Sequence, residues 1–257
     1  MAGMSPFLSA ALDAARAAGQ IITRLYHAGV DVSYKADHSP VTRADVEAER
    51  AIRSLLTERF PDHGFYGEET GRERATAEYV WLVDPIDGTK AFVRRYPMFS
   101  TQIALMRRGE LVVGVSSAPL YGDLAYAEKG SGASLNGEPA RISAIDRIEE
   151  CALSAGNLRT LAAGARWPAY GRIVSRVNRI RGYGDFLHYH LLASGRIDAV
   201  LESDVNILDI AALVVIVREA GGTVSDLDGG DITLATTSVL AANRILHRKI
   251  LAELTAD

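Results

Sequence analysis

The 257-residue chain lacks most features of secreted, membrane-spanning and nucleic-acid-binding proteins. Its single cysteine, Cys151, excludes an intramolecular disulfide and a cysteine-based zinc site, and fits a reducing compartment. The longest apolar run, residues 210–217, is far shorter than the roughly 20 residues that cross a bilayer. The net charge of −4 provides no broad basic surface for nucleic acid or for an anionic membrane.

The remaining composition is that of an ordinary globular protein. Hydrophobic residues make up 48% and charged residues 23%, which excludes the disordered and fibrous classes. Asp13 and Arg16 interrupt the N-terminal segment before a signal-peptide core develops. No internal repeat or Pro/Ser-rich linker divides the chain, so any two halves must pack against each other. We therefore expect a cytoplasmic protein with no nucleic-acid or membrane partner.

Hydrophobic periodicity predicts a layered α/β architecture. Apolar residues at helical spacing predict a first helix that ends near Gly29, and Thr42 with Asp45 is typical of a capping box that opens a second helix. Beyond residue 140, strand-like and helix-like segments alternate, and a helix predicted over 209–220 is apolar on nearly all sides and therefore buried. Further strands are predicted at 79–83, 100–106, 111–116, 152–154 and 199–201, and further helices at 166–178, 186–193 and 243–254.

The most informative segment is residues 81–89, WLVDPIDGT, where a buried strand delivers two carboxylates and a hydroxyl into a tight turn. The carboxyl ends of strands are where α/β sheets bind ligands. Asp84 and Asp87 offer the oxygen ligands that Mg²⁺ prefers, and the residues after them offer helix N–H groups to an anion. The pattern predicts a metal-assisted phosphate site. An ordinary turn followed by a helix cap remains the alternative for this segment alone.

The spacing of the two aspartates separates two kinds of phosphatase chemistry. Haloacid-dehalogenase-type phosphatases also end a strand in Asp and Gly-Thr, but their nucleophile and acid lie two residues apart. Here that second position is Ile86, and the next carboxylate is Asp87, three residues after Asp84. The spacing favours direct attack by a metal-activated water over a phospho-aspartyl enzyme.

Further acidic segments lie on both sides of residues 81–89. Glu68 and Glu69 belong to a Gly-Glu-Glu-Thr segment, and Asp209 precedes an Ala-Ala helix that ends in Glu-Ala-Gly-Gly. The three segments, in this order and at these spacings, resemble the signatures of the inositol-monophosphatase-like family of Mg²⁺-dependent phosphatases over essentially the full chain. One departure is Leu208, which stands where the family usually has Trp, and this leaves the local packing open.

The resemblance implies the family's αβαβα sandwich. An N-terminal α+β subdomain, residues 1–140, would carry the first metal-site motifs and pack on a C-terminal α/β subdomain, residues 141–257, with the substrate-side residues and the third metal-ligand motif. The resemblance also implies a homodimer, two or three Mg²⁺ ions per subunit, and a small phosphorylated metabolite as substrate.

The resemblance further assigns roles to individual residues. It implies a water-activating pair, Asp45 with Thr89, and a phosphate-holding turn at Gly88 and Thr89 beside Asp87. Two metal ions can activate a water and stabilise the leaving oxygen, so no histidine base is required. Taken singly, each carboxylate has an ordinary explanation as a helix cap or a loop charge. The implied Mg²⁺ ligands are Glu68 (also a catalytic residue), Asp84, Asp87, Asp209 and the carbonyl oxygen of Ile86.

Substrate choice depends on residues that face the alcohol part of the ester, and by resemblance these are Arg181, Asp185 and Glu202. The segments RGYGDF and DGTKAF look more like the histidinol-phosphate phosphatase branch than the inositol branch. We therefore expect a histidinol-phosphatase of histidine biosynthesis. The alternatives are an inositol-1-monophosphatase, a 3′(2′),5′-bisphosphate nucleotidase and a non-catalytic binding relative.

Two further groups of residues have ordinary explanations beside functional ones. Arg172, Arg176 and Arg179, at helical spacing, are the candidate subsite for the second phosphate of a nucleotidase substrate, although a solvated or subunit-contacting face explains them more simply. His188 and His190, if helical, lie about 200° apart and cannot hold one ion. We expect these histidines to be hydrogen-bonded or half-exposed.

Overall fold

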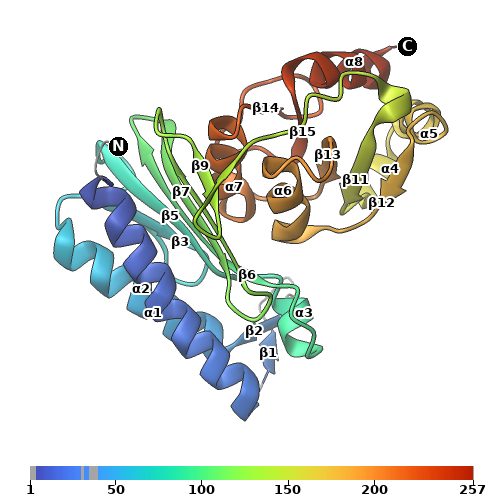
Figure 1. The fold of residues 1–257 in the computed structure, drawn as a ribbon. Coiled ribbons are helices and arrows are strands. Elements are labelled where there is room, and N and C mark those ends of the chain that lie inside the picture. The colour runs from blue at the N-terminus through green and yellow to red at the C-terminus, as the bar shows by residue number, and fades with distance from the viewer. Residues whose placement is uncertain (1–3, 30–31, 35–39, 257) are drawn as a thin grey trace.

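The computed structural model describes residues 4–29, 32–34 and 40–256, and its helices and sheets form five layers (Figure 1). Helices α1 and α2 cover one face of an eight-stranded sheet, α6 and α7 lie between this sheet and a five-stranded sheet, and α4, α5 and α8 cover the outer side. This order is the αβαβα sandwich that the family resemblance implied, and it confirms the layered α/β architecture predicted from the sequence pattern. The helices are α1 (Pro6–Ala28), α2 (Arg43–Arg59), α3 (Thr89–Val93), the 3₁₀ turn η1 (Ile148–Glu150), α4 (Arg159–Ala163), α5 (Trp167–Val174), α6 (Asp185–Ala193), α7 (Ile207–Glu219) and α8 (Arg244–Thr255).

Both main sheets are mixed. The large sheet has the order β10-β9-β8-β7-β6-β5-β3-β4, in which β3 and β5 are parallel, and the small sheet has the order β12-β11-β13-β15-β14, in which β11 is parallel to both neighbours. A separate pair joins β1 and β2. The strands are β1 (Val32–Tyr34), β2 (Pro40–Thr42), β3 (Gly64–Gly67), β4 (Gly71–Glu73), β5 (Tyr79–Asp87), β6 (Ser100–Arg107), β7 (Glu110–Ala118), β8 (Asp123–Glu128), β9 (Ala133–Leu135), β10 (Glu138–Ala140), β11 (Ala152–Gly156), β12 (Arg179–Arg181), β13 (Ala199–Ser203), β14 (Thr223–Ser225) and β15 (Ser238–Ala242).

Three hydrophobic clusters fill the spaces between the layers, and the central one is built around α7. Helix α7 is buried on nearly all sides, as its sequence predicted, because both sheets pack against it. Leu208 is 4% exposed and belongs to this central cluster, so an aliphatic side chain fills the position where Trp was expected. Within the described ranges, none of the helices is both long enough and apolar enough to cross a bilayer.

The predicted subdomain boundary at residue 140 lies between the last strand of the large sheet, β10, and the first strand of the small sheet, β11. Helix α7 nevertheless comes from the second half of the chain and packs on β6 and β7 of the first. The two halves therefore share the central core, and a division of the chain into two subdomains stays a prediction.

The helix predicted over residues 166–178 is wrong at its C-terminal end. Helix α5 ends at Val174, and residues 179–181 form β12, which pairs in parallel with β11. The backbone N–H of Arg179 donates to the carbonyl oxygen of Cys151 at 3.2 Å, so sheet pairing outweighs the helical spacing of the sequence. Arg172 and Arg179 therefore do not share one helix face.

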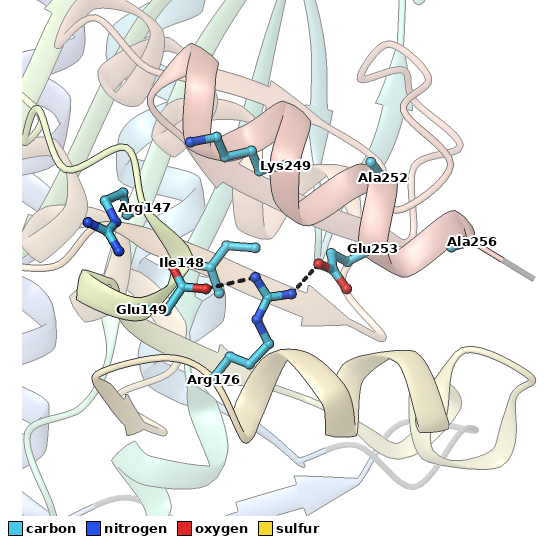
Figure 2. Close-up of a pocket in the computed structure, with 8 residues that line it drawn as sticks. All are labelled: Arg147, Ile148, Glu149, Arg176, Lys249, Ala252, Glu253 and Ala256. Carbon is cyan, nitrogen blue, oxygen red and sulfur yellow. Dashed lines mark hydrogen bonds and ion pairs between the residues drawn. The ribbon is translucent and has the colours of Figure 1, made fainter.

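Arg176, the middle arginine of this group, is already neutralised. Its guanidinium lies between Glu149 of η1 and Glu253 of α8, with 2.8 Å between Nη2 and the nearer oxygen of Glu149 (Figure 2). These hydrogen bonds raise the pKa of Arg176 above its ordinary value. Arg176 ties surface elements together and does not form an open basic subsite for a second phosphate.

The close packing of α7 on the large sheet leads to a prediction about Gly114 in β7. A Cβ added there would lie 2.3 Å from the carbonyl oxygen of Ala212 in α7. We expect Gly114→Ala to lower the free energy of unfolding by about 2 kcal/mol or more, because α7 cannot shift without disturbing the central core. Urea unfolding would measure the change.

Gly171 in α5 provides the matched control, because nothing lies within 4 Å of its Cβ position. Gly171→Ala should raise the free energy of unfolding by about 0.5–1 kcal/mol through helix propensity alone. Equal stability of Gly114→Ala and the unmodified protein would contradict the close packing of β7 on α7 at Gly114.

Candidate functional site

A cleft of about 390 Å³ lies where the carboxyl ends of strands meet the N-terminal ends of α3, α6 and α7. Six of its described lining residues are acidic and one, Lys90, is cationic. A cleft with this charge would repel a phosphate ester unless cations entered with it. The lining residues are Glu68, Asp84, Ile86, Asp87, Gly88, Thr89, Lys90, Ala91, Tyr96, Asn157, Asp185, Asp204 and Asp209.

A β-bulge at the end of β5 turns Asp84 and Asp87 toward the same cleft. Residues three apart on a regular strand point to opposite faces. Pairing with β6 is regular as far as Asp84 and shifts register before Asp87, so the bulge changes the direction of the second side chain. The bulge is held by two hydrogen bonds, from Ile86 N–H to Asp84 Oδ1 and from Thr101 Oγ1 to the carbonyl oxygen of Pro85, each 2.9 Å long.

Asp209 reaches the cleft from the first turn of α7. It forms a capping box with Asn206, whose backbone N–H and side-chain amide donate to the two carboxylate oxygens at 2.9 and 2.6 Å. The capping explanation of Asp209 and its proposed metal ligation are compatible, because each carboxylate oxygen keeps a further lone pair.

The three aspartates form an oxygen-rich cluster in which one carboxylate oxygen from each lies within 4.8 Å of the others. Burial raises the pKa of Asp84 and Asp87 well above the ordinary value, and neighbouring carboxylates raise it further. Burial also raises the pKa of Asp209 to about 7, although its bonds to Asn206 oppose the shift. Hard oxygen donors that repel one another are the ligands Mg²⁺ prefers, so the residues present fit the expected metal.

Glu68 lines the same cleft from the carboxyl end of β3, beside β5. The loop that carries it is fixed by Glu49 of α2, whose two carboxylate oxygens accept the N–H groups of Glu69 and Thr70, both at 2.8 Å. Glu49 is 0% exposed. Sequence reasoning missed Glu49, although a charged residue on the buried side of a predicted helix was a signal for it.

Asp45 and Thr89, the predicted water-activating pair, are in contact. The Thr89 hydroxyl lies 3.2 Å from Asp45 Oδ1 and 3.0 Å from the carbonyl oxygen of Ile86. The other oxygen of Asp45 accepts the N–H and hydroxyl of Thr42, at 2.8 and 2.6 Å, and completes the predicted capping box. Burial raises the pKa of Asp45, while the bonds from Thr42 lower it. Thr89 can donate to Asp45 and still accept a hydrogen bond from a water in the cleft.

Gly88 forms the turn between β5 and α3 with φ +94°, a conformation that favours glycine. A Cβ at Gly88 would lie 2.6 Å from the carbonyl oxygen of Met98, so a side chain there would disturb both segments. Gly88 and Thr89 both line the cleft, where the phosphate-holding turn was predicted.

The three predicted substrate-side residues differ in their access to the cleft. Asp185 lines it from the first turn of α6, with a left-handed φ of +45°. Arg181 is exposed at the end of β12, where it donates to the carbonyl oxygen of Ile180, and it is not part of the described lining. Glu202 is 2% exposed, and it accepts a hydrogen bond from Asn157, which is part of the lining.

Asn157, Asp204 and Tyr96 line the cleft without having been singled out from the sequence. Asn157 and Asp204 follow directly on β11 and β13, so the rule that ligands bind at the carboxyl ends of strands could have found them. Tyr96 lies in the loop after α3, and its sequence neighbours carry no comparable signal.

The raised carboxyl pKa values predict that Mg²⁺ stabilises the protein more as the pH rises. Between about pH 4, where an unfolded Asp ionises, and about pH 7, the folded protein keeps a proton on Asp209 that the unfolded chain has lost. The metal-free protein therefore loses stability as the pH rises, whereas Mg²⁺ binds the ionised carboxylates and restores it.

Thermal melting with and without saturating Mg²⁺, at about pH 5.5 and about pH 8, tests whether Mg²⁺ stabilises the protein more at the higher pH. We expect a larger increase in Tm at the higher pH, and a much smaller increase at both pH values for Asp209→Asn. An equal increase at the two pH values would contradict the coupling of cation binding to the ionisation of these carboxyls, and an undiminished increase in Asp209→Asn would contradict the cluster as the cation site.

Comparison with known proteins agrees with this geometry. Residues 3–256 match the model of the inositol monophosphatase family. The chain is 37% identical to a histidinol-phosphatase from Mycobacterium tuberculosis, with 91% of this chain and 93% of the relative covered, and 35% identical to an inositol-1-monophosphatase from Caulobacter vibrioides, with 95% and 99% covered. The solved structure of an IMPase from Thermotoga maritima matches with a TM-score of 0.86 at 32% identity, covering 97% of each chain. With its acidic cluster at the end of β5, the chain belongs to the inositol monophosphatase family and is a Mg²⁺-dependent phosphomonoesterase.

Proposed function

We propose that this phosphomonoesterase is a histidinol-phosphatase that acts in histidine biosynthesis. The observation that carries the proposal is Asp185, a carboxylate that lines the cleft beside the aspartate cluster. Histidinol phosphate has an ammonium and an imidazole group, whereas inositol phosphate has only neutral hydroxyls beyond its phosphate. A carboxylate on the alcohol side of the cleft favours the cationic ester through charge-assisted hydrogen bonds.

The surroundings of Asp185 support a binding role over a capping role. The N-cap residue of α6 is Gly184, and Asp185 itself has a positive φ, which is uncommon for a residue with a side chain. Burial raises the pKa of Asp185, the charge of Glu202 raises it further, and His188 opposes the shift. The charge of Asp185 also raises the pKa of Asp87, and both residues line the same cleft. A cationic substrate group between them would relieve this repulsion.

In the proposed reaction the protein's own groups bind the ester and orient a water. Bound Mg²⁺ supplies the positive charge that lowers the pKa of that water and stabilises the phosphoryl oxygens. Asp84, Asp87 and Asp209, with Glu68 and the carbonyl oxygen of Ile86, would hold two or three ions. Thr89 would orient the water and pass its proton toward Asp45, while the Gly88 turn would hold the phosphate. A homodimer remains part of the proposal.

Inositol-1-phosphate is the nearest alternative substrate, since a 35% identical relative is named for it. A bisphosphate nucleotidase has less support, because Arg176 of its candidate second-phosphate subsite is paired with two glutamates. A non-catalytic role would leave the complete acidic set unexplained.

The first test of the mechanism is Asp84→Asn. We expect this variant to fold and to lose nearly all turnover at saturating Mg²⁺, because Asp84 is one of the three clustered carboxylates that would hold the metal. Near-normal hydrolysis by the folded variant would contradict the metal assignment. Rapid-quench labelling should find no phosphate on Asp84, since the attack is by water.

The second test concerns the substrate. We expect kcat/KM for L-histidinol phosphate to exceed that for inositol-1-phosphate by at least about tenfold. Asp185→Asn should reduce this preference, because it removes the charge that binds the ammonium or imidazolium group.

Asp204→Asn is the matched control for the second test, because it removes a charge from the same cleft. The carboxylate of Asp204 already accepts hydrogen bonds from Thr160 and Ser203. An equal loss of preference in both variants would assign the effect to the overall charge of the cleft. A preference of the unmodified protein for the inositol ester would refute the histidinol proposal and leave the phosphatase mechanism intact.

A further inference from the structure

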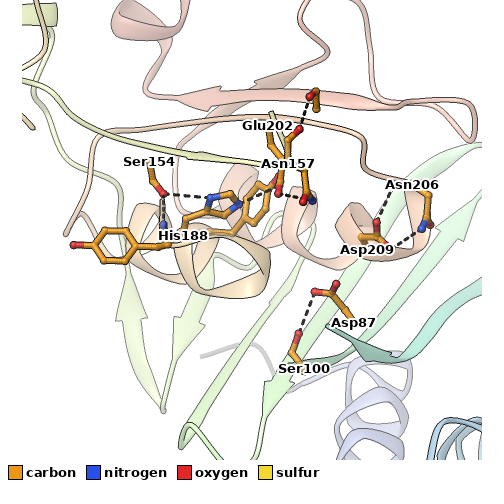
Figure 3. A network of polar contacts seen from close by, with 11 residues as sticks. Asp87, Ser100, Ser154, Asn157, His188, Glu202, Asn206 and Asp209 are labelled. Atoms are coloured by element: carbon orange, nitrogen blue, oxygen red, sulfur yellow. Dashed lines mark hydrogen bonds and ion pairs between the residues drawn. The ribbon is translucent and has the colours of Figure 1, made fainter. Parts of the chain in front are cut away.

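Glu202 lies behind the cleft at the centre of a chain of hydrogen bonds that, among the described residues, reaches the lining at Asn157 (Figure 3). Glu202 comes from β13 and Asn157 follows β11, the neighbouring strand. We call Tyr183, Ser154, His188, Glu202 and Asn157 together the Glu202 relay.

The contact with Glu202 fixes the orientation of the Asn157 amide. Asn157 Nδ2 donates to Glu202 Oε1 at 3.1 Å. The NH₂ group of Asn157 therefore faces Glu202, which leaves the amide oxygen free to accept a hydrogen bond elsewhere. The backbone of Asn157 has φ +46°, a left-handed conformation that Asn tolerates better than most residues.

The other end of the relay fixes His188. The backbone N–H of Tyr183 donates to Ser154 Oγ at 3.2 Å, so the Ser154 hydroxyl is free to donate to His188 Nδ1, 3.4 Å away. In the tautomer in which Ser154 donates to Nδ1, His188 Nε2 carries the hydrogen and donates to Glu202 Oε2, 3.1 Å away. The hydrogen bonds of the relay thus all run toward Glu202.

The surroundings allow Glu202 few other positions. The Tyr189 hydroxyl donates to the same oxygen as His188 at 3.0 Å, and burial raises the pKa of Tyr189 well above its ordinary value, so it keeps its proton. A Cβ on Gly156 would lie 2.6 Å from Glu202 Oε1, which means that the glycine provides the space for the carboxylate. His188 is 0% exposed, so its role cannot depend on direct contact with substrate.

His188 and Asp185 lie three residues apart on α6 and therefore on neighbouring parts of one helix face. One helix thus contributes both a residue of the cleft lining and the buried donor that fixes Glu202. Through Glu202, the relay joins this helix to Asn157, a second residue of the lining.

We propose that Asn157 is a specificity-determining residue whose amide oxygen accepts a hydrogen bond from a hydroxyl or ammonium group of the substrate, and that His188 is a positioning residue that acts on Asn157 through Glu202. The inference rests on the proposed phosphatase function and deepens it. It concerns the alcohol part of the ester and leaves the metal site unchanged.

The experiment compares kcat/KM for the preferred ester, histidinol phosphate or inositol-1-phosphate, with kcat/KM for p-nitrophenyl phosphate, whose leaving group has no hydrogen-bond donor. Asn157→Gly removes the amide and suits the positive φ, and His188→Leu removes the donor to Glu202. We expect the ratio of the two kcat/KM values to fall about tenfold in each variant, mainly through a higher KM for the preferred ester. His188→Gln, which can place an N–H near Nε2, should keep the ratio within about threefold of the unmodified protein.

Two further measurements separate positioning from general structure. The double variant His188→Leu with Asn157→Gly should lose no more than Asn157→Gly alone, because His188 acts through Asn157. His247→Leu is the matched control: His247 is also a buried histidine bonded to a serine, Ser225 at 2.9 Å, but it packs away from the cleft on α8. His247→Leu should leave the ratio of the two kcat/KM values unchanged.

The proposal is overturned if Asn157→Gly leaves the ratio unchanged, if the double variant loses the product of the two single losses, or if His188→Leu and His188→Gln lower both rates equally. If His188→Leu fails to fold in thermal melting, Asn157→Gly and His188→Gln decide the question. Absence of any Mg²⁺-dependent turnover by the unmodified protein would overturn the proposed function itself, whereas a constant ratio in an active enzyme overturns the relay alone.

Discussion

The mutual repulsion of carboxylates is the interaction on which the rest of the site depends. Asp84, Asp87 and Asp209 lie within a few ångströms of one another in a buried place, with Glu68 and Asp185 lining the same cleft. Such a group is unfavourable for folding unless it is protonated or bound to cations. The local structure prevents the side chains from relaxing into solvent: a bulge fixes Asp84, a capping box fixes Asp209, and buried Glu49 fixes the loop of Glu68. The fold therefore holds these mutually repelling carboxylates close together, where bound cations can neutralise their charge.

The same constraint explains why capping and catalysis use the same residues. Asp45 and Asp209 each complete a capping box at a helix N-terminus, and each also faces the cleft or a residue that lines it. A carboxylate that is held by backbone N–H groups has a defined direction for its remaining lone pairs. From the sequence, helix capping and a role in the site are competing explanations for Asp45 and Asp209. In the structure, the capping hydrogen bonds orient these carboxylates for their proposed roles in the site.

The sequence predicted those parts of the fold that follow from local pattern. The first helix ends at Ala28 with Gly29 as its C-cap, the second begins after Thr42, and α7 is buried, because periodicity and capping chemistry determine these features within one segment. The end of α5 was wrong because pairing of Arg179 with β11 depends on a strand far away in the chain. Glu49 and Asn157 each had a signal in the sequence, a charge on the buried side of a predicted helix and a position at the carboxyl end of a strand. The contacts that they make, with Glu69 and with Glu202, depend on how distant segments pack. The placement of Glu202 behind Asn157 likewise depends on how β11 and β13 pair, which no single segment specifies.

Helix α7 has a consequence for the integrity of the whole molecule. Its first turn carries Asp209 into the cleft, while its body fills the space between the two sheets. A fragment that ended near residue 140 would leave the inner face of the large sheet exposed to water, and the remaining fragment would have a hydrophobic helix with half of its partners missing. Neither fragment would possess the three aspartates together. Metal binding and burial of the central core therefore both depend on α7 packing between the two sheets. The chain would lose both if it were cut between its sheets.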